Sequence, residues 1–249
     1  MLSRRKLLQV MSAAAVTPAA AVRSRPVPDS ALVPAYFHPE VSPEDWLRLA
    51  DPRLYAVVLN IDSGPGPGPD PAFQRVVRRI EDGGGTVAAY VDVSYARRDP
   101  ALVAEDLRRY RDWYEVADVF FDQAPAAPDA LPYMRSVTEA ARTGGADLVV
   151  FNHGVYPDPA YAALADVLVT FEGSVDAYQA LAPPSWPRSH SRHRFCHLVH
   201  TCPSDRLEEV LTLARRRHTA LVYVTDRSLP NPYDGLPPHF PRLLALGSL

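Results

Sequence analysis

The sequence has 249 residues, 47% hydrophobic and 22% charged, which is long enough for one domain with a large core and excludes a disordered chain. Its formal net charge is −3 and its only lysine is Lys6, so nothing in the composition indicates a nucleic-acid surface.

Residues 1–26 have the pattern of an export signal. Arg4 and Arg5 precede a short Ala-rich apolar segment, and Ala19-Ala20-Ala21 offers a cleavage site. This resembles a twin-arginine leader, with a Sec-type signal or a retained anchor as the alternatives. No other apolar run reaches the ~20 residues that a spanning helix needs. We expect a secreted, extracellular protein without membrane contact after signal cleavage, whose single domain covers residues 27–249.

Apolar runs alternate with helical patterns through the rest of the chain. The alternation predicts a single (β/α)8 TIM barrel. A doubly wound open sheet fits less well, because no Gly-rich phosphate loop follows the first strand. The expected strands are 31–37, 54–61, 86–93, 119–121, 147–151, 167–171, 195–199 and 220–224. The expected helices are 42–49, 71–80, 100–114, 130–142, 159–164, 175–181, 205–217 and a last one containing Phe240, Leu243 and Leu244.

Two helix details follow from the same patterns. Ser42 stands where a capping residue is expected for the first helix. In the helix over 100–114, the spacing of Leu102, Leu107, Tyr110 and Tyr114 predicts a buried face.

Polar residues follow nearly every expected strand. The carboxyl ends of barrel strands meet at one mouth, which is where such folds keep their chemistry. Several of the acids could instead cap helices, an interpretation that we accept for Asp92 and Asp226. The candidates at the strand ends are Tyr36, His38, Asn60, Asp92, Tyr95, Asp122, Asn152, Glu172, His200 and Asp226, and Tyr90 and Tyr233 add further aromatic faces and hydroxyls for sugars.

Two acids stand out among these residues. Side chains alternate along a strand, so Phe120 should share a face with Asp122, and Thr170 with Glu172. Both carboxylates then point into the same mouth. A pair of acids beside aromatic residues is the set of side chains that glycoside hydrolysis requires, and one of the two carboxyl groups must stay protonated.

A cluster of histidines and cysteines near residue 200 suggests a metal site, but the spacing argues against it. Residues four apart in a strand are ~13 Å apart, too far to share one ion. We therefore expect no metal and no cofactor. A disulfide is doubtful, because six extended residues span ~20 Å and a bridge needs Cα atoms within ~7 Å. The chain would have to reverse after His200. The residues concerned are His190, His193, His197, His200, Cys196 and Cys202.

The segments LVPAYFHP, NIDSGPG, AAYVDVSYARR, WYEVADVFFDQ, VVFNHGVYP, VTFEGS and VYVTD resemble the spherulin-4 family, in order and spacing, from about residue 32 to residue 244. The resemblance implies a (β/α)8 glycoside hydrolase that cleaves α-1,4-linked N-acetylgalactosamine or galactosamine polymers of microbial biofilm matrices. It also implies Asp-Glu after the fourth strand and Glu after the sixth. Asp122 and Glu172 match two of these positions, and Gln123 stands at the third.

Three interpretations remain open. The first is a secreted endo-acting glycoside hydrolase with Asp122 and Glu172 as catalytic residues and a polysaccharide as its partner. The second is a carbohydrate-binding barrel without turnover, because Gln123 neither donates a proton as an acid nor acts as a carboxylate. The third is a hydrolase of another polymer on the same fold. We expect a monomer. The substrate-binding candidates are Tyr36, His38, Asn60, Tyr90, Asp92, Tyr95, Gln123, Asn152, His200, Asp226 and Tyr233.

Overall fold

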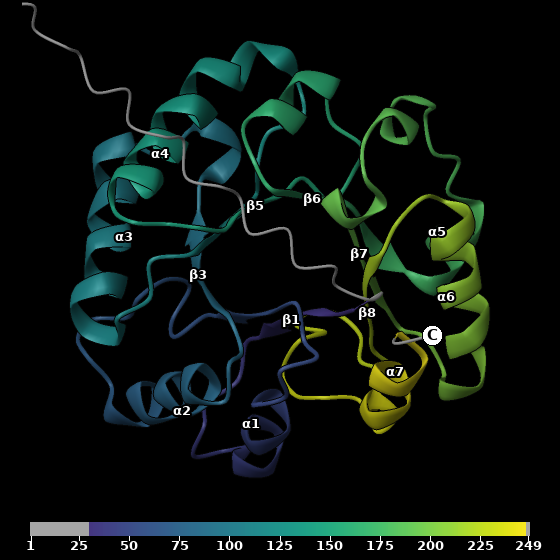
Figure 1. Ribbon diagram of the computed structural model, residues 1–249, viewed down its shortest axis with the longest axis horizontal. Coiled ribbons are helices and arrows are strands. Elements are labelled where there is room, and N and C mark those ends of the chain that lie inside the picture. Colours follow the sequence, from purple (N-terminus) through teal and green to yellow (C-terminus); the bar gives the residue numbers. More distant parts are fainter. Residues whose placement is uncertain (1–29, 248–249) are drawn as a thin grey trace, which may run out of the picture.

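The computed structural model describes residues 30–247, so the predicted leader lies outside the described residues. Eight parallel strands form one sheet in chain order (Figure 1). Each predicted strand is present, with ends that differ by a few residues. The strands are β1 (Leu32–Ala35), β2 (Ala56–Leu59), β3 (Val87–Asp92), β4 (Val119–Asp122), β5 (Val149–Asn152), β6 (Val167–Ser174), β7 (Phe195–His200) and β8 (Leu221–Val224).

The sheet closes through the residue that precedes β1. Ser30 forms a parallel bridge with Leu221 of β8. The N–H of Ser30 donates to the carbonyl of Ala220 at 3.1 Å, and the N–H of Val222 donates to the carbonyl of Ser30 at 2.9 Å. The sheet therefore curls back on itself with helices outside it (Figure 1). This confirms the (β/α)8 TIM barrel, and the doubly wound open sheet is wrong.

Helices connect the strands around the outside of the barrel. Between β5 and β6 the connection is a short 3-10 helix, where the sequence predicted a brief helix. Within residues 30–247, no helix is long and apolar enough to cross a bilayer. The α-helices are α1 (Pro43–Leu49), α2 (Pro71–Asp82), α3 (Pro100–Tyr114), α4 (Leu131–Thr143), α5 (Val175–Ala180), α6 (Leu207–Arg216) and α7 (Phe240–Gly247). The 3-10 helices are η1 (Ser94–Ala96), η2 (Pro128–Ala130), η3 (Pro159–Ala163), η4 (Trp186–Ser189), η5 (Arg192–Arg194) and η6 (Ser204–Arg206).

Three helices begin at an Asp-Pro pair. In each, the aspartate carboxylate accepts a hydrogen bond from a backbone N–H of the first turn, and the proline occupies the next position, where its missing N–H costs nothing. These pairs fix where α2, α3 and η3 start, and so how the preceding strands end. The bonds are Asp70 to Ala72 N (2.7 Å), Asp99 to Ala101 N (2.8 Å) and Asp158 to Ala160 N (2.9 Å).

Two helix predictions are wrong. Ser42 stands at the start of α1, but its side chain makes no capping bond. Its ψ of 60° lacks the extended conformation of Asp70, whose ψ is 117°. Leu102 is 51% exposed, whereas Val103 and Leu107 are buried. A spacing of five residues turns Leu102 away from Leu107 on the helix, and Val103, four residues before Leu107, takes the buried face.

Candidate active site

The strand register decides which polar side chains enter the barrel. Paired residues of parallel strands point to the same side of a sheet. Tyr90 pairs with Phe120 and Asp92 with Asp122, so all four face the barrel interior. By the same register, the carboxyl ends of the strands bring together Tyr36, Asn60, Tyr90, Asp92, Asp122, Asn152, Glu172 and His200.

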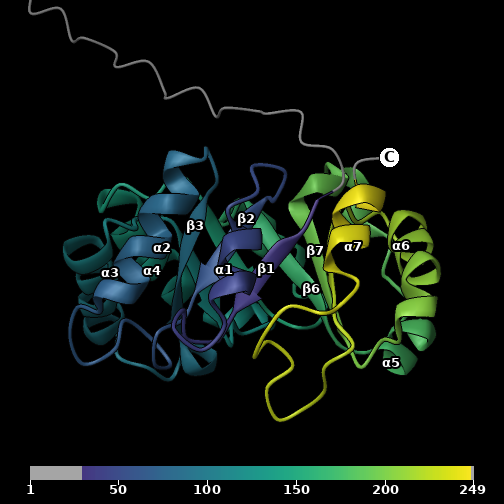
Figure 2. The same ribbon diagram turned by 90° about the horizontal axis from the view of Figure 1, so that it is seen from below.

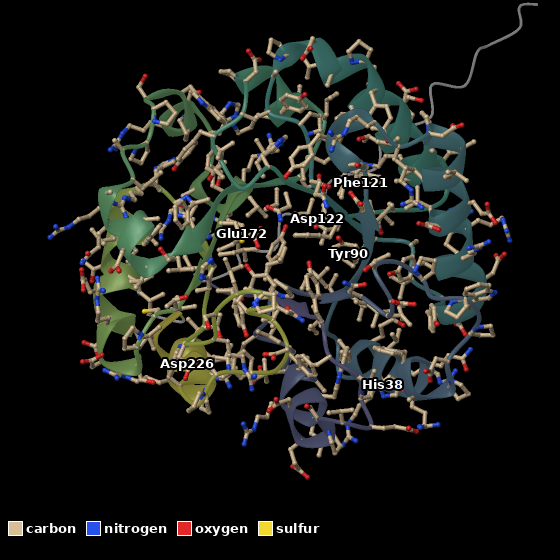
Figure 3. All side chains as sticks on the ribbon, turned by 180° about the vertical axis from the view of Figure 1, so that it is seen from behind. His38, Tyr90, Phe121, Asp122, Glu172 and Asp226 are labelled. Atoms are coloured by element: carbon tan, nitrogen blue, oxygen red, sulfur yellow. The ribbon has the colours of Figure 1, made fainter. Side chains whose placement is uncertain are left out.

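The side-chain amide of Asn152 joins the two predicted acids. Its Nδ2 lies 2.7 Å from Asp122 Oδ1 and 2.7 Å from Glu172 Oε2, so each amide hydrogen goes to a different carboxylate. The two oxygens are therefore at most twice that distance, about 5.4 Å, apart. Figure 3 shows Asp122, Glu172 and Tyr90 close to one another near the middle of the barrel.

Tyrosine hydroxyls complete the hydrogen bonding of both acids. Tyr90 donates to Asp122 Oδ2 at 2.8 Å, and Tyr233 donates to Glu172 Oε1 at 2.7 Å. Tyr36 stands between these two tyrosines, with its ring 5.4 Å from each of theirs and edge-on to both. The acids thus share one amide and lie against an aromatic wall of three rings.

Burial governs the electrostatics of the pair. Loss of water raises the pKa of Asp122, while hydrogen bonds from Tyr90, Asn152 and the backbone N–H of Gln123 lower it. Burial also raises the pKa of Glu172; two hydrogen bonds lower it, and the negative charge of Asp122 raises it further. Asp122 therefore has three donors that favour its charged form and the charge of Asp92 opposing it, whereas Glu172 has two donors and the opposing charge of Asp122.

A β-bulge in β6 directs Glu172 into the barrel, and it corrects one of our predictions. Val169 pairs with Cys196 and Phe171 pairs with His197, so Thr170 is an extra residue opposite no partner. Thr170 does not share a face with Glu172. Its hydroxyl lies 3.1 Å from His197 Nε2, on the helix side of the sheet. Simple alternation fails here because a bulge reverses the side to which all later residues point.

Glycines allow the chain to pass close to Glu172. Gly154, just after β5, has φ of +66°, and its carbonyl accepts a hydrogen bond from the backbone N–H of Glu172 at 3.0 Å. A Cβ on Gly173 would lie 2.9 Å from the ring of Phe171, so a larger residue would push that ring away. Both glycines therefore help to fix the backbone that carries Glu172.

A cavity of about 640 Å³ opens beside the acids. It lies toward β1, β2 and the loop between β8 and α7. Two carboxylates face it, Asp62 and Glu172, and within the described part of the chain none of its lining residues is Lys or Arg. The lining residues are Tyr36, Phe37, His38, Asn60, Ile61, Asp62, Ser63, Tyr90, Glu172, His200, Leu229, Pro230, Asn231, Pro232 and Tyr233.

The loop between β8 and α7 supplies one wall of this cavity. Figure 2 shows this yellow segment projecting beyond the ends of the strands. It is tied to the barrel, because the N–H of Tyr36 donates to the carbonyl of Tyr233 at 3.0 Å and the N–H of Leu236 donates to Asp45 at 3.0 Å. Tyr233 was predicted as an aromatic candidate, but Asn231, Pro232 and Asp62 of the cavity were missed. The only signal for them was that they lie in Pro-rich loops that follow strands.

Four predicted binding residues lie outside the acid cluster. His38 lines the cavity and bonds Asp70 at 3.2 Å. Tyr95 is 54% exposed on η1 and does not line the cavity. Gln123 follows Asp122 with φ of 52°. Asp226 is exposed, away from the cavity, and Figure 3 places it near the outer edge.

The histidines and cysteines near residue 200 do not converge. His197 points outward among hydroxyl groups, whereas His200 lines the cavity. Cys196 and Cys202 are buried and free, so they form no disulfide. In residues 30–247, no group of three His, Cys, Asp or Glu side chains is placed to hold a metal ion.

These features define the class of protein as a (β/α)8 barrel with a partly buried acid pair at the carboxyl ends of its strands, the end at which such barrels place their active sites. The chain belongs to spherulation-specific family 4, whose model matches residues 30–246. This confirms the family resemblance seen in the sequence.

The chain also resembles solved structures. The crystal structure of Aspergillus clavatus Sph3 in complex with GalNAc is 25% identical, with a TM-score of 0.77, and the match covers 89% of this chain and 98% of that one. A 2,3-dimethylmalate lyase of the PEP mutase/isocitrate lyase superfamily is 12% identical, with a TM-score of 0.46, over 89% of this chain and 90% of that one. Among proteins with a curated description, none matches the sequence.

Proposed function

We propose that this protein is a glycoside hydrolase that cuts an amino-sugar polysaccharide, of the endo-α-1,4-galactosaminidase or N-acetylgalactosaminidase type, with Asp122 and Glu172 as its catalytic pair. The observation that carries the proposal is the single Asn152 amide nitrogen lying 2.7 Å from both carboxylates. The likeness to Sph3, which was crystallised with GalNAc, supports the class of sugar.

The spacing of the acids favours a retaining reaction. Retaining glycosidases hold their carboxyl groups about 5–5.5 Å apart, and inverting ones about 6.5–9.5 Å apart to admit a water. The facing oxygens of Asp122 and Glu172 are no more than about 5.4 Å apart, because both bond to Asn152. This fits direct attack by one carboxylate on the sugar.

The surroundings of the two acids assign their roles. Asp122 accepts three hydrogen bonds that favour its charged form, one more than Glu172. Glu172, whose pKa is raised by burial and by the charge of Asp122, holds the proton. Tyr233 can accept that proton in a hydrogen bond, since a tyrosine hydroxyl both donates and accepts. Asp122 is therefore the nucleophile and Glu172 the general acid.

The reaction then has two steps. In the first, Asp122 attacks the anomeric carbon while Glu172 gives its proton to the glycosidic oxygen, so the leaving sugar departs and a glycosyl ester forms on Asp122. In the second, the Glu172 carboxylate takes a proton from water as the water oxygen attacks the same carbon, and Asp122 is released as a carboxylate. Glu172 ends protonated, as it began.

The cavity fits a neutral or cationic sugar. Asn60, Asn231 and His200 offer groups for sugar hydroxyls or an acetamide, and Tyr36 offers a ring face. Asp62 adds a carboxylate, and within the described residues the lining includes no basic Lys or Arg. Such a lining disfavours binding of polyanionic glycans, because their negative charges would lie near the carboxylates of the cavity without a positive charge to balance them.

Tyr95 is a further candidate for sugar binding, outside the cavity. Ser94, Tyr95 and Ala96 have φ of 48°, 54° and 65°, a conformation that costs about 1–2 kcal/mol per residue. The turn is held because Asp92 accepts from the N–H of Ser94 at 2.6 Å, and Tyr95 donates its N–H to the carbonyl of Gln123 at 2.8 Å. An exposed ring on this turn, with the Arg97 guanidinium 5.7 Å from its centre, suits stacking with a sugar unit outside the cavity.

The second candidate function is a sugar-binding barrel without turnover, and Gln123 motivates it. An amide carries neither the proton nor the charge of a glutamate. However, the contacts of Gln123 are made by its backbone, which donates to Asp122 and accepts from Tyr95. These contacts are the same for glutamine and glutamate, which supports catalysis over binding alone.

Reducing-end release from α-1,4-linked galactosamine and N-acetylgalactosamine oligosaccharides tests the proposal. We expect cleavage by the native protein, an α-configured first product, and loss of nearly all activity in both Asp122→Asn and Glu172→Gln with the fold intact. Survival of activity in either variant would place the chemistry elsewhere. Binding without cleavage, with cleavage appearing in Gln123→Glu, would establish the sugar-binding barrel.

We also propose that the protein is exported through the twin-arginine leader at residues 1–26. Mass spectrometry of the protein outside the cell should give a chain that starts near Val22. A chain retained inside the cell with Met1 intact would overturn this proposal.

A further inference from the structure

A second group of polar side chains lies behind the acids, on the helix side of β6 and β7. His197 is its centre. Its Nδ1 lies 2.8 Å from the hydroxyl of Tyr178, and its Nε2 lies 3.1 Å from Thr170, 3.2 Å from Thr219 and 3.3 Å from Tyr156. His197 and Thr170 are fully buried. The catalytic steps proposed above use none of these five side chains.

This hydroxyl cluster meets the backbone at the β6 bulge. Thr170 is the extra residue of the bulge, and His197 is the β7 residue that pairs with Phe171, the next residue along β6. The Thr170–His197 hydrogen bond therefore links the two strands at the point where their register shifts. Phe171 packs on the same side, with its ring 4.9 Å from that of Tyr178.

The bulge determines where Glu172 points. Val169 pairs with Asn152 of β5 and with Cys196 of β7, which places it on the barrel interior. In an unbroken strand, Phe171 would also point inward and Glu172 would point to the helices. The extra residue reverses this order, so Phe171 packs outward and Glu172 reaches Asn152.

We propose that Thr170 and His197 are positioning residues for Glu172, which act by locking the β6 bulge with a side-chain hydrogen bond behind the barrel. The inference rests on the proposed function in that Glu172 is taken as the general acid. It goes beyond that function because neither residue touches the substrate or the reacting atoms.

The chemistry of the cluster suits a permanent lock. Burial and the nearby charge of Arg217 lower the pKa of His197 to about 3, so the ring stays neutral at every pH at which the site would work. A neutral imidazole has one donor and one acceptor, and hydroxyls fill either role. A valine at position 170 would fill the same space without the hydroxyl, so what Thr170 adds here is its hydrogen bond to His197.

Thr170→Val tests the lock, because it keeps the shape and removes the hydroxyl. We expect kcat to fall about 10- to 100-fold with KM nearly unchanged, the scale of a displaced catalytic group. The pH profile of kcat/KM, whose limbs report the acid pair as a coupled system, should change. Thr170→Ser keeps the hydroxyl and should restore kcat.

Thr219→Val is the matched control. Thr219 contacts the same His197 nitrogen at 3.2 Å but lies outside the bulge. It should lose similar thermal stability and keep kcat within about twofold, a change below ~0.5 kcal/mol. Equal losses of kcat in Thr170→Val and Thr219→Val, or native kcat and pH dependence in Thr170→Val, would overturn the lock.

A readout without turnover separates this inference from the proposed function. The pKa of Glu172 is followed by NMR of carboxyl-labelled glutamate in the native protein and in both valine variants. If the native protein cleaves nothing, the catalytic proposal fails, yet the lock still predicts a shifted Glu172 titration in Thr170→Val alone. An unshifted titration would refute the lock in either case.

Discussion

Replacing Asn152 by leucine would show whether one amide sets the ionisation of both acids. Leucine has a similar shape, donates no hydrogen bond and leaves no room for water to take over. Asp122 would keep Tyr90 and the backbone N–H of Gln123, and Glu172 would keep Tyr233. Each carboxylate would thus lose one donor and retain the rest.

The size of the effect follows from the bond that each acid loses. A hydrogen bond to a charged group contributes about 1.5–3 kcal/mol, and one pKa unit corresponds to about 1.36 kcal/mol. Because the lost donor favoured the charged form, the pKa of Asp122 and that of Glu172 should each rise by about 1–2 units.

The assay is the pH dependence of kcat/KM, whose two limbs report the pair as a coupled system. Both limbs should move to higher pH by about 1–2 units. Asn152→Ala admits water and should move them less, and Asn60→Ala, which lines the same cavity without touching an acid, should not move them. Limbs that stay in place in Asn152→Leu, or that move to lower pH, would refute the reasoning.

Three further predictions follow from the same geometry. Glu172→Gln should be inactive yet melt about 2–4 °C higher at pH 7, because a raised pKa of Glu172 makes the folded protein less stable as the pH rises above about 4. This gain in Tm should vanish toward pH 4, and a lower Tm at pH 7 would contradict the prediction. Gln123→Glu should leave kcat within about threefold, less than ~1 kcal/mol, and a gain of orders of magnitude would show that the site needs that acid. Tyr95→Ala should weaken binding of long oligosaccharides and spare the shortest, with Tyr95→Trp unaffected; calorimetry over a length series decides this.

The sequence was sufficient to predict where the two acids lie in the fold, but not why their side chains point into the barrel. Buried runs such as 119–121 end directly in a carboxylate, and parallel strands bring their carboxyl ends together, so position alone predicted that Asp122 and Glu172 would meet. Simple alternation predicted that the Glu172 side chain points into the barrel, but for the wrong reason, because it placed Thr170 on the same face. The bulge at Thr170 depends on how β6 pairs with β7, and that pairing is a property of two strands together.

Other parts of the site come from contacts across long separations. Tyr233 reaches Glu172 from 61 residues away, through a loop whose prolines indicate only that it is not a strand or helix. The double role of Asn152 depends on the register of β4, β5 and β6 acting at once. Local sequence patterns carry no information on contacts between residues so far apart in the chain. The sequence therefore predicted that these residues lie at the mouth of the barrel without predicting their hydrogen-bond partners.

The acid pair itself argues for chemistry rather than binding alone. Two buried carboxylates that share one amide lower the stability of the fold at neutral pH, because burial raises the pKa of each. A barrel that only held sugars would gain nothing from burying two charges there, because neutral polar groups also bond sugar hydroxyls. Two coupled carboxyl groups with different hydrogen-bond donors suit the roles of an acid and a nucleophile. Gln123 lies outside the bridge between Asp122 and Glu172, so its lost charge leaves this asymmetry in place.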